Sequence, residues 1–309
     1  LSSAKADPHA NTIIERIQQF SQQDQPEILE IGCNDGKFVR LLQERSFSKI
    51  SAIEPALDAF TSARKISGNI INDFFGYEAA RKYYIKNRFD VVVTRQVLEH
   101  IKDLHDFLEG INYVLATNGT LIIEVPDQSM NYELLDYSFW EEHINYFTLN
   151  TLGQLLFPHG FEIVHHESVL FSGKAMILYC KKNNMNTGRL AKSYYIDRDF
   201  NSRSVYLETF DELRLQMQVF LGKITEGNRR IIVYGAGCRS LCLNSFLGIS
   251  EHIAFFVDDS ENKIYKYDPC SKNQILTSDN IENNDHILLG VNSEVERKVC
   301  ISKNLDKDR

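Results

Sequence analysis

The chain has 309 residues, which is long enough for two domains that each bury a core. Its 43% apolar and 25% charged residues are ordinary for a globular protein and exclude wholesale disorder. A net charge of −8 without any Lys/Arg-rich run opposes binding to phosphate backbones, so we expect no nucleic-acid partner. No apolar run approaches about 18 residues, and the N-terminal segment is polar, so we expect a cytoplasmic protein without a membrane partner.

The first half of the sequence alternates strand-like and helix-like segments, a pattern that predicts a mostly parallel sheet and an α/β fold. The expected strands are 27–31, 50–53, 69–71, 89–94, 119–125, 161–167 and 175–180. The expected helices are 12–20, 38–44, 59–66, 104–115 and 151–157. We therefore expect a Rossmann-like domain over residues 1–182.

The second half is predicted to hold a connection and a smaller domain. Residues 183–204 are polar, and the apolar spacing of 206–223 predicts a long amphipathic helix, so 183–228 is expected to connect two domains. The expected elements after it are strands 231–234, 253–257 and 286–289 and helix 240–247. These predict a second Rossmann-like α/β domain over 229–309.

The most informative segment is the glycine turn Glu30-Ile-Gly-Cys-Asn-Asp-Gly36, directly after the first expected strand. Parallel sheets bind ligands at the carboxyl ends of their strands, where glycine lets a ligand approach the backbone. Glu54 ends the second strand, where a carboxylate suits the two hydroxyls of a ribose. Asp73 and Phe74 follow the third strand and suit an adenine ring. Together these strand ends predict a site for a nucleoside-containing cofactor.

The turn favours S-adenosylmethionine (SAM) over a nicotinamide cofactor. It lacks the Gly-x-Gly-x-x-Gly pattern, and it places Asp35 close to the start of a helix. A carboxylate there repels a pyrophosphate but suits the ammonium group of a methionine. We therefore expect SAM as the cofactor and S-adenosylhomocysteine as its product.

Several segments resemble the nucleotide-sugar C-methyltransferases of deoxysugar biosynthesis, a family of SAM-dependent class I enzymes with a C-terminal Rossmann-like domain. The resemblance lies in the turn 30–36, in Val92-Val-Thr-Arg-Gln-Val-Leu-Glu-His-Ile101, Glu124-Val-Pro126 and Glu142-His-Ile-Asn-Tyr-Phe147, and in segments 233–237, 244–249 and 256–259. With the strand-end pattern, it implies these cofactor-binding residues: Glu30, Gly32, Cys33, Asn34, Asp35, Gly36, Glu54, Pro55, Asp73, Phe74, Gln96 and His100.

The resemblance also implies a catalytic pair, Glu142 and His143, in which His143 takes a proton from the carbon beside a sugar ketone. Trp140 stands where the family usually has Tyr, and its indole N–H can donate but cannot accept or ionise. We count Trp140 as a third catalytic candidate and Tyr146 as a substrate contact. We expect no counterpart of the family's N-terminal zinc-binding domain in this chain, and we expect the chain to end before the final strand of the second domain.

A second glycine turn, Tyr234-Gly-Ala-Gly-Cys-Arg239, opens the second domain. A strand, a glycine turn and a helix can hold a phosphate at the helix start, with an arginine as a bidentate donor. We expect these residues to bind the nucleotide part of the substrate: Tyr234, Gly235, Gly237, Arg239 and Asp258. A purely structural tight turn is the alternative.

No metal site is predicted. Cys238 and Cys242 have no second cysteine pair at metal-ligand spacing, and the adjacent His165 and His166 point to opposite faces of a strand. We expect a SAM-dependent methyltransferase that methylates a carbon of a nucleoside-diphosphate keto-sugar in polysaccharide or natural-product biosynthesis. The alternatives are a sugar or small-molecule O-methyltransferase, a non-catalytic SAM-binding protein, and an NAD-dependent oxidoreductase that uses the Gly235 turn.

Overall fold

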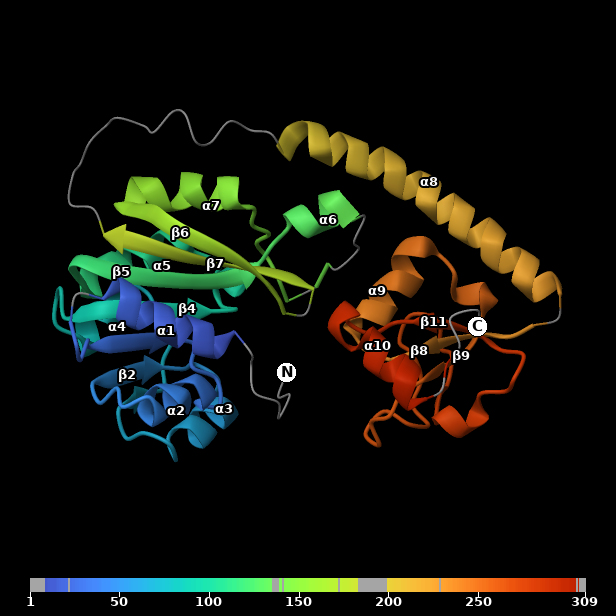
Figure 1. The fold of residues 1–309 in the computed structure, drawn as a ribbon, viewed down its shortest axis with the longest axis horizontal. Coiled ribbons are helices and arrows are strands. Elements are labelled where there is room, and N and C mark those ends of the chain that lie inside the picture. The colour runs from blue at the N-terminus through green and yellow to red at the C-terminus, as the bar shows by residue number, and fades with distance from the viewer. Residues whose placement is uncertain are drawn as a thin grey trace. The chain divides into compact units, whose positions relative to one another are not determined.

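The computed structural model describes residues 9–21, 23–134, 139–140, 142–171, 173–182, 199–227, 229–303 and 305. They form two compact units, shown as ribbons in Figure 1. The first unit consists of the described residues within 1–127, 142–169 and 174–196. The second unit consists of the described residues within 128–141, 170–173 and 197–309.

The first unit contains a seven-stranded sheet in the order β3-β2-β1-β4-β5-β7-β6. The strands are β1 (Ile28–Ile31), β2 (Ile50–Ile53), β3 (Ile70–Ile71), β4 (Phe89–Arg95), β5 (Leu115–Pro126), β6 (Phe161–Leu170) and β7 (Lys174–Lys182). β1 pairs in parallel with both β2 and β4, whereas β7 runs antiparallel to β5. The strand order therefore reverses between β1 and β4, and open α/β sheets bind ligands at such a switch point.

Helices cover both faces of this sheet (Figure 1). One face is covered by α1 (Ala10–Phe20), α2 (Lys37–Glu44) and α3 (Leu57–Ala63), and the other by α4 (Tyr77–Tyr83), α5 (Leu104–Val114) and α7 (Leu149–Leu156). All residues of β1 and β2 are buried, as expected for parallel strands covered on both sides. The short helices η1 (Leu98–His100) and η2 (Phe157–His159) follow β4 and α7.

The second unit contains a four-stranded parallel sheet in the order β10-β9-β8-β11. Its elements are α6 (Ser129–Leu134), α8 (Asp199–Glu226), β8 (Ile231–Tyr234), α9 (Cys238–Leu247), η3 (Ser250–His252), β9 (Ile253–Val257), β10 (Ile275–Leu276), η4 (Ser278–Asn280), β11 (His286–Leu289) and α10 (Ser293–Ser302). α8 begins at Asp199, ahead of the expected start at 206, while 183–198 lie outside the described residues. In the described part of the chain, no helix is long and apolar enough to cross a membrane.

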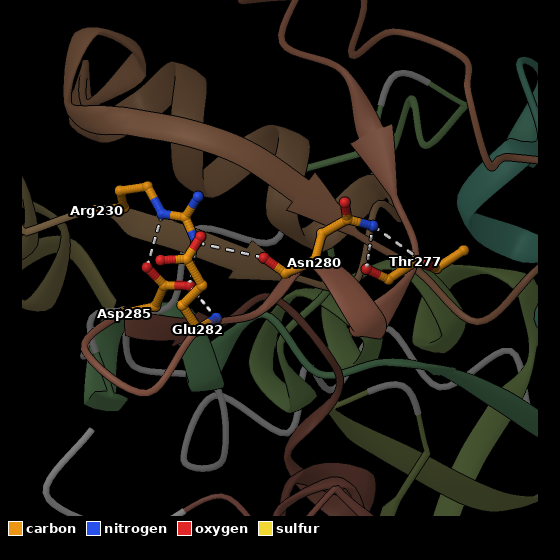
Figure 2. Close-up of polar contacts among 5 residues, drawn as sticks. All are labelled: Arg230, Thr277, Asn280, Glu282 and Asp285. Carbon is orange, nitrogen blue, oxygen red and sulfur yellow. Dashed lines mark hydrogen bonds and ion pairs between the residues drawn. The ribbon is translucent and has the colours of Figure 1, made fainter.

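A buried carboxylate ties together the starts of β8 and β11 in the second unit. Asp285, with a side chain only 3% exposed, accepts hydrogen bonds from Nε and Nη2 of Arg230, both at 2.8 Å (Figure 2). Arg230 also forms an ion pair with Glu282 at 3.0 Å and donates to the carbonyl of Asn280. The bidentate pair therefore joins two neighbouring strands at their amino ends.

Replacing Asp285 with Asn should lower the free energy of unfolding of the second unit by about 1–2 kcal/mol, as measured by urea denaturation. The loss stays moderate because Arg230 is 39% exposed and water screens its charge. Glu282→Gln is the matched control, since that side chain is 72% exposed and should change stability by less than about 0.5 kcal/mol. Equal losses in both variants would contradict the assignment of the pair.

Candidate cofactor and catalytic site

The turn after β1 requires glycine at its first and last positions. Gly32 and Gly36 have φ angles of +75° and +81°, in the left-handed region. A Cβ on Gly32 would lie 2.4 Å from Cγ2 of Val97, and one on Gly36 would lie 3.0 Å from Cα of Ala63. The backbone of 32–36 is thus packed directly against the ends of β4 and α3, at the carboxyl edge of the sheet.

Glu54 joins this turn to the end of β2. Its side chain is 6% exposed, and its carboxylate accepts the backbone N–H of Asn34 at 2.8 Å and that of Ala56 at 2.9 Å. The side-chain amide of Asn72, just after β3, donates to the carbonyl of Glu54 at 2.8 Å. The structure therefore brings together the ends of β1, β2 and β3, as the sequence predicted.

Asp73 and Phe74 follow β3 at the same edge. Asp73 accepts a hydrogen bond from the Tyr83 hydroxyl at 2.7 Å, and this bond is the main cause that lowers the pKa of Asp73. Phe74 is 78% exposed, so its ring is available for stacking. Tyr83 comes from α4, a helix that the sequence did not predict, and its role beside Asp73 was missed for that reason.

Glu30 lies on β1 with 3% of its surface exposed. Burial raises the pKa of Glu30 to about 8; the positive charge of Arg95 opposes this, and the charges of Glu54 and Asp35 add to it. Within the described residues, its Oε2 has no hydrogen-bond partner. A buried carboxyl group with an unused acceptor next to the glycine turn suits the ammonium group of a methionine moiety.

Glu30→Gln should flatten the pH dependence of stability. The unfolded chain releases this proton near its ordinary pKa of 4.5, whereas the folded chain holds it up to about 8. The stabilising contribution is therefore complete below 4.5 and is lost as the pH rises through 8. Urea denaturation between about pH 5 and 9 should show a smaller decline in the variant than in the wild type. The exposed Glu44→Gln on α2 is the control, and equal declines in both variants would contradict the assignment.

Gln96 follows β4 in the left-handed region, at φ +52°. Its amide donates to the fully buried Glu124 at 3.0 Å, and Nε of Arg95 donates to the same carboxylate at 2.9 Å. Burial raises the pKa of Glu124, but His9 and Arg95 outweigh it and lower the pKa below the usual value. Arg95 and His9 thus hold Glu124, the residue that orients Gln96. The sequence did not identify His9 as a partner of Glu124 because the two residues lie far apart along the chain.

The segment 142–147 is anchored to η1, just beyond the end of β4. The backbone N–H groups of Ile144 and Asn145 both donate to the carbonyl of Glu99, at 2.9 and 3.0 Å. The Asn145 amide adds a bond to the carbonyl of Ile101 at 2.7 Å. These bonds hold the Glu-His-x-x-Tyr-Phe motif against η1, at the carboxyl edge of the sheet.

His143 is half-buried in this segment, and its ring lies edge-to-face with that of His100, with centroids 4.8 Å apart. Nδ1 of His100 is bonded to the carbonyl of Glu142 at 2.8 Å. Burial, followed by the neighbouring His100, lowers the pKa of His143 to about 4, while Glu142 acts in the opposite direction. His143 is therefore neutral at neutral pH. Tyr146 lies near it, with ring centroids 6.1 Å apart.

Trp140 is partly buried and belongs to the second unit, whereas Glu142 and His143 belong to the first. Its catalytic role stays a prediction.

Two further predicted cofactor contacts lie in the turns that contain Gly32 and Glu54. Cys33 is buried there, and Pro55 is partly buried.

The second glycine turn is built like the first. Gly235 has φ +99°, and the next backbone N–H, of Ala236, donates to the carboxylate of Asp258 at 2.8 Å. Asp258 thus reaches from the end of β9 to the turn after β8, as Glu54 does between β2 and β1. The Tyr234 hydroxyl donates to Asp259 at 2.8 Å, and Arg239 donates to Asn292. Gly237 completes the turn, and the binding role predicted for these residues stays a proposal.

Two family models match the sequence. The one described as a methyltransferase domain matches residues 7–166, which is just over half of the chain, and the one described as a C-methyltransferase C-terminal domain matches residues 198–292. Together they confirm that the chain is a C-methyltransferase with SAM as its cofactor, and they confirm the predicted class I fold with a second, smaller domain.

Among curated proteins, the chain is similar to the C-methyltransferase NovU of Streptomyces niveus, with 24% identity over 166 residues that cover 53% of this chain and 39% of NovU. It is also similar to the mitochondrial arginine-hydroxylase NDUFAF5 of Mus musculus, with 30% identity over 159 residues that cover 48% of this chain and 46% of that protein. Both matches span less than half the length of the relative.

Among solved structures, the chain is similar to a SAM-dependent methyltransferase from Archaeoglobus fulgidus, with 16% identity and a TM-score of 0.47 over 56% of this chain and 94% of that one. Another is the PH0226 protein from Pyrococcus horikoshii, with 16% identity and a TM-score of 0.47 over 59% of this chain and 93% of that one. The family assignment rests on the two family models. Because a methyltransferase domain is followed by a C-methyltransferase C-terminal domain, the chain belongs to the C-methyltransferase family of SAM-dependent, class I methyltransferases.

Proposed function

We propose that the chain transfers the methyl group of SAM to a carbon atom of a nucleoside-diphosphate keto-sugar. The observation that carries this proposal is the placement of His143, an imidazole that is neutral at neutral pH and is anchored at the cofactor edge of the sheet. The C-terminal domain match and the name of the Streptomyces niveus relative support carbon as the methylated atom.

The residues at the sheet edge fit the cofactor. The glycine turn leaves room for a ligand against the backbone, Glu54 suits the ribose, and the exposed ring of Phe74 suits the adenine. The unused acceptor on Glu30 suits the ammonium group. When bound, SAM supplies a methyl group that is made electrophilic by its sulfonium.

In the proposed reaction, His143 takes the proton from the substrate carbon beside the ketone. The electron pair left on that carbon would form the new bond to the methyl group while the bond from this methyl to the sulfonium sulfur breaks and its electron pair goes to sulfur, which would leave S-adenosylhomocysteine. The proton would stay on His143 until water removes it. Glu142 raises the pKa of His143 and so stabilises the imidazolium formed in this step. Trp140 enters the proposal only as a hydrogen-bond donor for the ketone oxygen.

A sugar O-methyltransferase is the second candidate. It is favoured by Trp140, because methylation of a hydroxyl needs a base but no group that stabilises an enolate. The arginine-hydroxylase relative also shows that similarity in this domain extends to a protein named for another reaction. Locating the labelled methyl group on the product by NMR distinguishes a C-methylated from an O-methylated sugar, and no incorporation with any sugar nucleotide would favour a non-catalytic SAM-binding protein.

Glu54→Gln should weaken the binding of S-adenosylhomocysteine by about 10- to 150-fold, because Gln cannot accept from both ribose hydroxyls with a charged group. Isothermal titration calorimetry measures this directly. Glu44→Gln, an exposed position on α2, should bind like the wild type. Unchanged affinity in Glu54→Gln would remove Glu54 from the cofactor site, and no binding by the wild type would defeat the proposed function.

A further inference from the structure

Three side chains of the first unit place atoms that can bind a metal close to one another. Glu99, His100 and His143 place one carboxylate oxygen and two imidazole nitrogens within 4.8 Å of one another. Glu99 and His100 come from η1, and His143 comes from the segment anchored to it. Two imidazoles and one carboxylate are a ligand set that divalent transition metals use in proteins.

Glu99 is the buried member of this cluster. It is 1% exposed, and in the described part of the chain neither of its carboxylate oxygens has a hydrogen-bond partner. Burial raises the pKa of Glu99 to about 8, and the charge of Glu124 adds to this effect. A buried carboxylate without donors is stabilised only by a proton or by a cation.

His100 is held with one nitrogen directed at Glu99. Its Nδ1 is bonded to the carbonyl of Glu142 at 2.8 Å, and since a carbonyl only accepts, Nδ1 must carry the hydrogen. The neutral ring therefore has its lone pair on Nε2, which lies 3.9 Å from a carboxylate oxygen of Glu99. Histidines that bind metals usually donate their other N–H to a carbonyl or carboxylate in this way.

We infer that Glu99, His100 and His143 form a binding site for one divalent transition-metal cation of the Zn²⁺ type. Ligand atoms about 2.1 Å from a tetrahedral ion stand roughly 3.4 Å apart, so small side-chain rotations close the present spacing. The two imidazoles disfavour Mg²⁺ and Ca²⁺, which prefer oxygen ligands. A three-residue site leaves a fourth position open to water or to a ligand.

The ion and the substrate proton would compete for the imidazole of His143. A lone pair bound to a metal cannot accept a proton, so bound Zn²⁺ should inhibit methyl transfer and a chelator should restore it. This consequence rests on the proposed function, whereas metal binding itself does not.

The test is a Co²⁺ titration of the purified, chelator-treated chain, followed by visible absorption without SAM or a sugar. A negative result then counts against the metal site and leaves the proposed methyl transfer untouched. We expect one saturable equivalent with the visible bands of nitrogen and oxygen ligands. No thiolate-to-metal band should appear, although Cys238 and Cys242 have sulfur atoms 4.0 Å apart.

Glu99→Gln and His100→Asn should each weaken Co²⁺ binding at least tenfold, roughly the range seen when metal sites lose a supporting group. The 39% exposed His100 provides a variant that keeps the fold even where Glu99→Gln does not. The control is His105→Asn, which breaks a separate exposed pair of histidines, His105 and His159, and should bind like the wild type. No binding by the wild type, a thiolate band, or full affinity in His100→Asn would overturn the inference.

Discussion

His143→Asn should lower the rate of methyl transfer by about 10²- to 10⁴-fold and leave the affinity for S-adenosylhomocysteine unchanged. Asn keeps hydrogen-bonding capacity at similar size but cannot take a proton near neutral pH. The loss should therefore appear in kcat, measured as transfer of labelled methyl to a keto-sugar nucleotide chosen by screening. The segment 142–147 is anchored through the backbone of Ile144 and Asn145, so the substitution should leave its position unchanged.

His105→Asn provides the matched control for this experiment. His105 is an exposed histidine on α5, and the same substitution there should leave the rate unchanged. If His143→Asn weakened cofactor binding as much as it slowed turnover, His143 would belong to the cofactor site and not to proton transfer. A wild-type rate in His143→Asn would eliminate it as the base.

Gly32→Ala should abolish measurable cofactor binding and destabilise the first unit by at least about 2 kcal/mol. Two effects add at this position. A residue with a Cβ is strained at φ +75°, and the new methyl group would stand 2.4 Å from Cγ2 of Val97. Calorimetry with S-adenosylhomocysteine measures the first loss, and urea denaturation measures the second.

The two effects at Gly32 can be separated. Adding Val97→Ala removes the atom that the new methyl group meets but leaves the backbone strain, so the double variant should recover only part of the stability. Gly68→Ala is the control, since no atom lies within 4 Å of a Cβ at that position. It should stay within about 0.5 kcal/mol of the wild type. Equal losses at Gly32 and Gly68 would contradict the role of the turn.

The strands were predictable because burial on both faces produces uninterrupted apolar runs. Residues 28–31 and 50–53 come close to this pattern, since each is apolar except for one residue, Glu30 or Ser51, and all eight residues are buried. α4 was missed because it has only seven residues and its one fully buried side chain is Ala80, which gives no apolar periodicity. β10 has only two residues, and α10, also missed, carries the highly exposed Ile301.

The residues of the candidate site that lie at the ends of strands were predictable from the sequence. Glu54 was identified because it directly follows the second expected strand, and Asp73 because it stands two residues after the third. The side chains that bind the acidic residues of the site were not identified, since they come from other elements. Tyr83, on α4, donates to Asp73, and His9, just before α1, pairs with Glu124. The cluster of Glu99 and His143 was missed for the same reason, because only the fold brings together two segments so far apart in sequence.

The two backbone hydrogen bonds of Glu54 bear on the entropy of cofactor binding. The N–H groups of Asn34 and Ala56 each hold one oxygen of this carboxylate. A carboxylate has about four acceptor positions, so two remain for a ribose diol. Ordering a side chain on binding costs about 0.5–1.5 kcal/mol, but here the rotamer is already fixed when the chain folds. A ribose bound to Glu54 as proposed would therefore meet a preorganised acceptor, and more of the intrinsic strength of its hydrogen bonds would appear as affinity.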